Sequence, residues 1–299
     1  MNINLIGVPM FYGSDIIGVE EAPSKLRENG IIDILKTNHI VYDLGDVFIK
    51  KCSIENKYKG NKKAKYLNEI KNACNNLAHS VYLSLKNNEF PIVIGGDHSL
   101  SLGSISGSSK YFKDDLAIIW IDAHGDFNSI NTSPSGNIHG MPLAALAGIG
   151  LKELKNIYFD GLKVKSDNIF ILSVRDLDEG EKKLLTENKV NLWTTNDIRE
   201  IGIEKVVSDI FNKISSKNIN NIHLSFDIDC MDASFVPGTG TKVEKGLNPE
   251  EVKKILGYIF KFNKIKALDF VEFNPKFDLN NITLNNCLDI LKLISYELR

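Results

Sequence analysis

Short apolar runs that end in aspartate or histidine restrict the fold of this chain more than any other feature. Three runs share the pattern: Pro91–Ile94 before Gly95–Ser99, Leu116–Ile121 before Asp122–Asp126, and Ile222–Phe226 before Asp227–Asp229. Apolar runs of this length are consistent with buried strands. Three strands far apart in the sequence are therefore expected to deliver charged side chains at their carboxyl ends. After the second run, strand-like alternation would turn Asp122, His124 and Asp126 to one side.

Helical patterns separate these strands. Strands are predicted at residues 2–8, 39–44, 91–94, 116–121, 168–173, 190–193, 222–226 and 265–271. Apolar residues three and four positions apart predict a helix between Lys65 and Lys86. Further helices are expected at residues 23–30, 100–106, 141–147, 203–214, 249–260 and from 282 onward. The alternation predicts an α/β fold with a single-domain three-layer α/β/α architecture and a mostly parallel eight-stranded sheet.

A closed eightfold βα barrel is the alternative architecture. Either arrangement would gather the polar residues at one rim, beyond the carboxyl ends of the strands. The connections between the predicted strands are very uneven in length and content, which favours the open sheet.

Composition supports one ordinary globular domain. The chain has 299 residues, of which 43% are hydrophobic and 25% charged, close to the average for soluble proteins. Length alone would allow two domains, but no linker divides the chain, so a single domain is expected over residues 1–299. The formal net charge of -2 gives no indication of nucleic acid or of an anionic membrane as a partner. The lysine-rich segment 50–65 is interpreted as a solvated loop.

Cysteine usage and the N-terminus bear on the compartment. The four cysteines form no CxxC pair, so neither a disulfide framework nor a zinc–thiolate site is indicated. The N-terminus lacks a basic segment followed by a long apolar stretch, and no run is long enough to span a bilayer. A cytoplasmic protein that contacts no membrane is expected.

The strand-end residues predict a metal centre. Carboxylates with histidine and without cysteine form a hard, oxygen-rich ligand set that suits manganese or iron better than structural zinc. Four aspartates and two histidines exceed what one ion needs, so two metals that share carboxylates are predicted. Because such a pair lowers the pKa of a bridging water, hydrolysis is the natural reaction class.

The three motifs also carry a resemblance to a known family. Gly95-Gly96-Asp97-His98-Ser99, Asp122-Ala123-His124-Gly125-Asp126 and Ser225-Phe226-Asp227-Ile228-Asp229 resemble the signature motifs of the ureohydrolase superfamily, the arginases, agmatinases and their relatives. The similarity extends over the whole chain and is greatest to arginases. Three motifs in the same order are far more specific than one short motif.

The resemblance implies a binuclear manganese site with two Mn²⁺ ions per subunit. One ion would be held by His98, Asp122, Asp126 and Asp227, and the other by Asp122, His124, Asp227 and Asp229. Asp122 and Asp227 would bridge the ions, while Asp97 and Ser99 could order the ligands.

The resemblance also assigns a substrate site. The residues that would bind the α-carboxylate of an amino acid are Asn128, Ser133, Ser135 and Asn137. Asp178 would meet the α-ammonium group, Glu272 would pair with the guanidinium group, and Thr241 could touch the substrate. His139 would shuttle a proton with Asp126.

The implied activity is hydrolysis of L-arginine to L-ornithine and urea by attack of a metal-bridging hydroxide. The alternatives are an agmatinase or another guanidino-acid ureohydrolase, or a non-catalytic metal-binding protein on the same scaffold. A decarboxylated substrate such as agmatine would leave the serine- and asparagine-bearing loop without a carboxylate to bind. Family resemblance further implies a homo-oligomer, a trimer or a hexamer.

Overall fold

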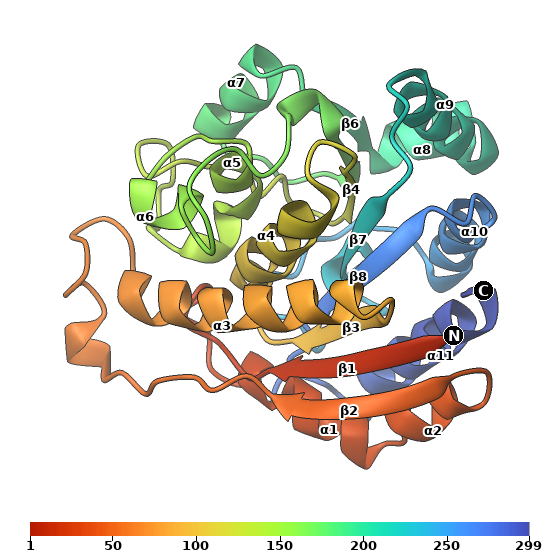
Figure 1. Ribbon diagram of the computed structural model, residues 1–299, viewed down its shortest axis with the longest axis horizontal. Helices are drawn as coiled ribbons and strands as arrows, with labels where there is room; N and C mark the ends of the chain where they lie inside the picture. Colours follow the sequence, from red (N-terminus) through yellow and green to blue (C-terminus); the bar gives the residue numbers. More distant parts are fainter. Residues whose placement is uncertain (299) are drawn as a thin grey trace.

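Eight parallel strands form one open sheet in the order β2-β1-β3-β8-β7-β4-β5-β6 (Figure 1). The computed structural model describes residues 1–298, so Arg299, the end of the expected domain, lies outside them. The strands are β1 (Asn2–Val8), β2 (Ile40–Asp46), β3 (Phe90–Gly95), β4 (Ala117–Ile121), β5 (Ile169–Val174), β6 (Asn191–Thr194), β7 (Ile222–Asp227) and β8 (Ile265–Val271). The predicted eight-stranded sheet is confirmed, and it is open rather than closed into a barrel.

Eleven α-helices are found in the described chain. They are α1 (Ala22–Glu28), α2 (Ile31–Lys36), α3 (Leu67–Lys86), α4 (Ser101–Phe112), α5 (Pro142–Leu146), α6 (Lys152–Lys155), α7 (Glu179–Glu187), α8 (Thr195–Ile201), α9 (Ile203–Ser216), α10 (Pro249–Phe260) and α11 (Ile282–Glu297). None of them is long and apolar enough to cross a membrane. The sequence did not predict α2, α6, α7 and α8, because helices of four to nine residues are too short to show a clear apolar period.

Each face of the sheet is covered by its own helices and core. Alternate residues of β4 enter different cores, with Ile119 in one and Trp120 in the other. Helices α3 and α4 contribute to the core that contains Trp120, while α9, α10 and α11 contribute to the core that contains Ile119 (Figure 1). This explains why the central strands are apolar throughout, since both of their faces are buried.

Helices α3 and α4 pack unusually closely. A Cβ atom added at Gly103 would lie 2.6 Å from the Cys74 carbonyl oxygen, and one added at Gly107 would lie 2.4 Å from that of Ala78. Any side chain at these positions would therefore push the helices apart. The contact holds the first turns of α4 against α3, directly after the Gly95–Ser99 motif that follows β3.

Candidate active site

The four central strands β3, β8, β7 and β4 lie side by side, and polar residues follow the carboxyl end of each. His98 begins a short 3-10 helix after β3, Asp122 directly follows β4, and Asp227 is the last residue of β7. Glu272 directly follows β8. All four side chains are buried. Parallel strands in this order bring residues separated by up to 174 positions to one edge of the sheet.

The segment after β4 does not continue as a strand. The strand ends at Ile121, and Asp126 has a left-handed backbone with φ of 47°. Strand alternation is therefore the wrong explanation for how Asp122, His124 and Asp126 converge, because the backbone leaves the strand conformation after Ile121. Glu272 also has a positive φ, 65°. Strained backbone of this kind tends to occur where side chains must be aimed at a site.

Two groups of nitrogen and oxygen atoms meet at this edge. His98 Nδ1 lies 2.9 Å from Asp122 Oδ2, 3.0 Å from Asp227 Oδ2 and 3.3 Å from Asp126 Oδ2. His124 Nδ1 lies 3.3 Å from Asp122 Oδ1 and 3.2 Å from an Asp229 carboxylate oxygen. Each carboxylate oxygen of Asp122 thus faces a different histidine.

The geometry suits two metal ions. His98, Asp122 and Asp227 form one set with ligand atoms within 4.8 Å of one another, and Asp122, His124 and Asp229 form a second. Asp122 belongs to both sets. Asp227, predicted as a second bridge, belongs to the first set alone, and Asp126 lies beside His98 without being a member of either.

A buried polar atom without a partner supports this assignment. His98 Nδ1 makes no hydrogen bond within the described chain, although its side chain is 1% exposed. An unsatisfied buried nitrogen costs free energy, and a cation among three carboxylates would satisfy it. The donor set of imidazole nitrogen and carboxylate oxygen fits manganese.

Crowding of the buried carboxylates also indicates a cation site. Burial raises the pKa of Asp126 well above its usual range, and the charge of Asp122 adds to this. Burial also raises the pKa of Asp227 well above its usual range, together with the charges of Asp229 and Asp122. Burial and mutual repulsion therefore disfavour the ionised carboxylates, and a divalent cation between them would favour them.

Contacts between Asp122 and the two histidines shift their pKa values in the direction that favours the charged forms. Burial acts to raise the pKa of Asp122, but contacts with His124 and His98 hold it below its usual range. Burial would lower the pKa of His98 and of His124, yet the neighbouring carboxylates raise both. Contacts with the two imidazoles therefore favour the ionised form of Asp122 in the absence of a metal.

His98 is held from its other side by a buried network. Its Nε2 lies 2.8 Å from Ser225 Oγ, and its ring stacks on Trp120 with ring centroids 3.8 Å apart. The Trp120 indole donates a 2.9 Å hydrogen bond to Asp122 Oδ2. Ser225 in turn lies beside Asp269, which accepts hydrogen bonds of 2.7 Å from Ser101 and Ser104.

Asp97 and Ser99 were expected to order the metal ligands, but their side chains bond within the turn after β3 and to Gly13. Asp97 accepts hydrogen bonds from the Ser99 backbone and hydroxyl and from the Gly13 backbone, at 3.0, 2.5 and 2.9 Å respectively. No hydrogen bond joins either side chain to a metal-ligand candidate in the part of the chain that the structure describes. They stabilise the turn after β3, while Ser225 and Trp120 contact the ligands.

A pocket of about 120 Å³ opens above the metal-ligand candidates. The residues that line it are His124, Asp126, Asn128, Ser133, Ser135, Asn137, His139, Gly140, Asp176, Asp178, Glu181 and Thr241. All the predicted substrate contacts except Glu272 are in this set. Glu272 lies just below, where its Oε1 is 3.2 Å from His139 Nδ1 and accepts a 2.8 Å hydrogen bond from the His98 backbone.

The pocket walls are joined by hydrogen bonds. Asn128 Nδ2 donates to Asp178 Oδ2 at 2.9 Å, which links the two predicted ends of the substrate site. Ser133 and Ser135 hydroxyls accept from backbone N–H groups of their own loop at 3.0 and 3.2 Å. Thr241 Oγ1 donates to Asp229 Oδ2 at 3.1 Å, between the pocket and the second metal-ligand set.

Comparison with known proteins decides the family. The sequence matches the family model described as Arginase family over residues 1–294. A protein named Arginase from Staphylococcus aureus (strain COL) is 38% identical over 290 residues, 97% of this chain and 95% of that protein. The native structure of arginase from Bacillus caldovelox at pH 5.6 has a TM-score of 0.93, with 35% identity and coverage of 98% of this chain and 97% of that one. The chain belongs to the arginase family.

Family membership confirms the resemblance predicted from the three motifs, and it identifies the chain as an arginase-family hydrolase. The arginase of Bacillus subtilis (strain 168) is 36% identical over 291 residues, 97% of this chain and 96% of that protein. The similarity therefore includes every strand and the whole strand-end site, and is not confined to the motifs.

Three residues of this arginase-family site were missed by sequence analysis. Glu181, on α7, lines the pocket, and burial raises the pKa of its carboxyl to about 7. Ser225 was quoted within a motif but given no role. Lys65 donates a 2.7 Å hydrogen bond to Asn137 Oδ1, although its segment was interpreted as a solvated loop. Glu181 accepts a hydrogen bond from the Phe127 backbone, Ser225 contacts His98, and Lys65 contacts Asn137. The partners in each pair are at least 54 positions apart in the sequence, so no local pattern indicates these contacts.

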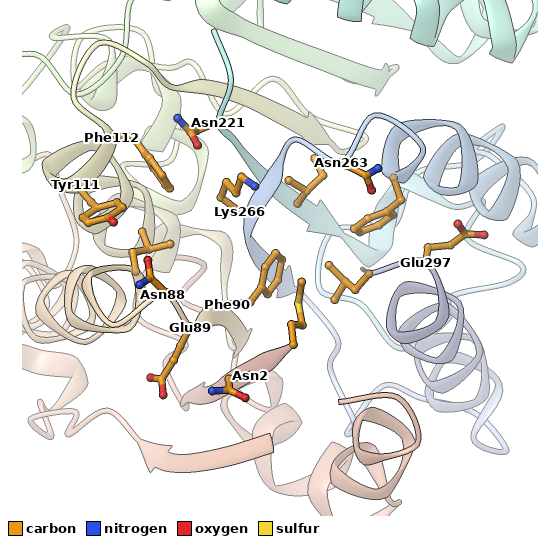
Figure 2. A pocket seen from close by; sticks show the side chains of 15 residues that line it. Asn2, Asn88, Glu89, Phe90, Tyr111, Phe112, Asn221, Asn263, Lys266 and Glu297 are labelled. Carbon is orange, nitrogen blue, oxygen red and sulfur yellow. The ribbon is translucent and has the colours of Figure 1, made fainter. Parts of the chain in front are cut away.

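A second pocket lies at the opposite edge of the sheet (Figure 2). It has a volume of about 310 Å³, and Figure 2 shows Phe90, Lys266 and Glu297 among its lining side chains. Lys266 lies near the amino end of β8, whereas Glu272 follows its carboxyl end. Neither metal-ligand set has a member in this pocket. Within the described residues, both metal-ligand sets lie at the carboxyl edge and this pocket lies at the amino edge.

Proposed function

We propose that this arginase-family hydrolase binds two Mn²⁺ ions and hydrolyses the guanidinium group of L-arginine to L-ornithine and urea. The observation that carries the proposal is the position of two metal-ligand sets, sharing Asp122, directly below a polar pocket. Relatives named Arginase, 36–38% identical over nearly their whole length, support the same substrate.

The metal ligands would be the six side chains that converge at the strand ends. His98, Asp122, Asp126 and Asp227 would hold one ion, and Asp122, His124, Asp227 and Asp229 the other. Two ions bound there would lower the pKa of a shared water towards neutrality and polarise the group under attack. The fold would contribute by holding the ligand side chains buried and oriented before the ions bind.

The pocket walls fit the two charged groups of an α-amino acid. Asn128, Ser133, Ser135 and Asn137 come from one loop and offer neutral hydrogen-bond donors suited to the α-carboxylate. Asp178, on the other wall, is acidic and suits the α-ammonium group. A substrate held at both groups would direct its side chain down towards the metal-ligand candidates.

Glu272 and His139 are placed to act at the guanidinium end. The buried Glu272 carboxylate can pair with the planar guanidinium group, because carboxylate and guanidinium match in a bidentate geometry. His139 Nδ1 faces Glu272 Oε1, which leaves Nε2 free to hold a proton for the leaving amine. Asp126 lines the pocket and lies 3.3 Å from His98, and it would take the proton that the attacking water loses and pass it, with His139, to the leaving amine.

The test is urea release by the purified, Mn²⁺-loaded protein, given L-arginine and agmatine in parallel, with a chelated sample as control. The proposal predicts chelator-sensitive release from L-arginine and little from agmatine. Preferential release from agmatine would favour the agmatinase alternative and contradict the carboxylate contacts. No release from either substrate, with metal bound, would favour another guanidino acid or a non-catalytic metal-binding protein.

We also propose that the protein is a homo-oligomer, a trimer or a hexamer, in the cytoplasm. The support is family membership. Sedimentation velocity of the metal-loaded protein distinguishes a monomer from either assembly, and cell fractionation tests the compartment.

A further inference from the structure

The Asn137 side chain is fixed in one orientation by two hydrogen bonds. Its Oδ1 accepts a 2.7 Å hydrogen bond from Lys65 Nζ, and its Nδ2 donates a 2.8 Å hydrogen bond to the Ser14 carbonyl oxygen. A flipped amide would face the ammonium group with its N–H donors and the carbonyl with its oxygen, losing both bonds. Ser14 uses one Nδ2 hydrogen, so the second is the donor that this pocket-lining side chain can offer to a carboxylate.

Lys65 is itself anchored. Its Nζ lies 3.0 Å from Asp15 Oδ2, and the Lys57 ammonium lies 2.9 Å from the same atom. The Lys65 backbone N–H donates to the Gly136 carbonyl oxygen at 3.1 Å, which joins the lysine-rich segment to the pocket loop. The Lys65 side chain is 14% exposed, so water screens it only partly.

The charges of this cluster do not cancel. Two lysines share one aspartate, so Lys57, Lys65 and Asp15 together carry a net positive charge behind Asn137. The opposite wall carries Asp178. A net positive charge behind Asn137 would favour the carboxylate of an α-amino acid at that wall, and Asp178 would favour its ammonium group.

We propose that Lys65 is a specificity-determining positioning residue, which locks Asn137 as a hydrogen-bond donor and selects substrates that carry a carboxylate. It acts through Asn137 and does not line the pocket itself. This inference rests on the proposed function, since it concerns how the α-carboxylate of the substrate is recognised.

The test compares Lys65→Met with the wild type and with Lys65→Arg, all loaded with Mn²⁺. Lys62→Met is the matched control, because Lys62 is an exposed lysine of the same segment. For Lys65→Met we expect KM for L-arginine to rise about tenfold, the usual effect of losing a charged hydrogen bond, while kcat changes less than about twofold. Lys65→Arg should restore most of the affinity, and Lys62→Met should leave both constants unchanged.

Ligand binding separates recognition from simple loop damage. L-Ornithine carries a carboxylate, and 1,4-diaminobutane is the same molecule without it. By calorimetry, Lys65→Met should weaken binding of L-ornithine and leave that of 1,4-diaminobutane unchanged. Equal weakening of both ligands, or an unchanged KM in an active enzyme, would overturn the inference alone. A wild-type protein that releases no urea from L-arginine would overturn the proposed function, and this inference with it.

Discussion

The Ser225 hydroxyl lies 2.8 Å from His98 Nε2, on the side of the imidazole opposite the three carboxylates that face Nδ1. In the tautomer in which Nε2–H donates a hydrogen bond to the Ser225 hydroxyl, the Nδ1 lone pair is directed at the metal-ligand set. A partner of this kind fixes the ring and its tautomer before a metal binds.

Replacing Ser225 with alanine should therefore weaken Mn²⁺ binding without removing a ligand. We expect the affinity for the ion held by His98 to fall about tenfold to a hundredfold, the usual effect of losing a partner of a metal-bound histidine. Metal content after dialysis at a series of free Mn²⁺ concentrations measures it. Ser106→Ala is the control, since Ser106 bonds only to its own helix at the Leu102 carbonyl. Equal affinity in both variants would show that Ser225 does not orient His98.

His139 should affect turnover and not metal content. His139→Asn removes the imidazole that faces Glu272 but no metal-ligand candidate. Loss of a general acid typically slows a reaction about a hundredfold or more, so kcat should fall by that order with two ions still bound. The exposed His79 provides the control variant, His79→Asn. Metal loss in His139→Asn would instead assign His139 a structural role at the metal site.

Glu181 should make the metal-free protein less stable as pH rises. Burial raises its pKa from 4.5 to about 7, so between these values the folded state binds a proton that the unfolded state has released. The free energy of unfolding therefore falls as pH increases through this window. At about 1.4 kcal/mol per pKa unit, the full effect is on the order of 3 kcal/mol.

Urea denaturation of the metal-free protein at pH 5, 6, 7 and 8 measures this slope. Glu181→Gln should show a smaller decline than the wild type, because glutamine does not titrate and can still accept the Phe127 N–H hydrogen bond. Glu187→Gln, an exposed site on the same helix, should behave as the wild type. Parallel pH profiles for wild type and Glu181→Gln would show that the carboxyl is ionised throughout.

The strands and the metal-ligand candidates could be predicted from sequence because both are local patterns. Leu116–Ile121 is apolar since both faces of β4 are buried, and its abrupt end in Asp122 marks the sheet edge. Parallel strands with their carboxyl ends together need no further information to bring such residues into one place. The family resemblance then supplied the order of the ligands.

The remaining features depend on contacts between distant segments. Lys65 resembles the other lysines of its segment, and only the folded loop shows that it meets Asn137. Glu181 belongs to α7, a nine-residue helix whose two buried residues are too few to reveal a periodic face. The direction of the Asp126 side chain depends on a left-handed backbone at a non-glycine residue, which no sequence pattern indicated.

The most direct test of the account is a Mn²⁺ titration of the metal-free protein, followed by urea release from L-arginine and by metal content. We predict that activity reaches its maximum at two ions per chain, as the two ligand sets require. Asp122→Asn, which alters the carboxylate common to both sets, should bind neither ion firmly and release no urea. The exposed-site control Asp114→Asn should match the wild type. Full activity with one ion or none, or an active Asp122→Asn variant, would contradict the binuclear site.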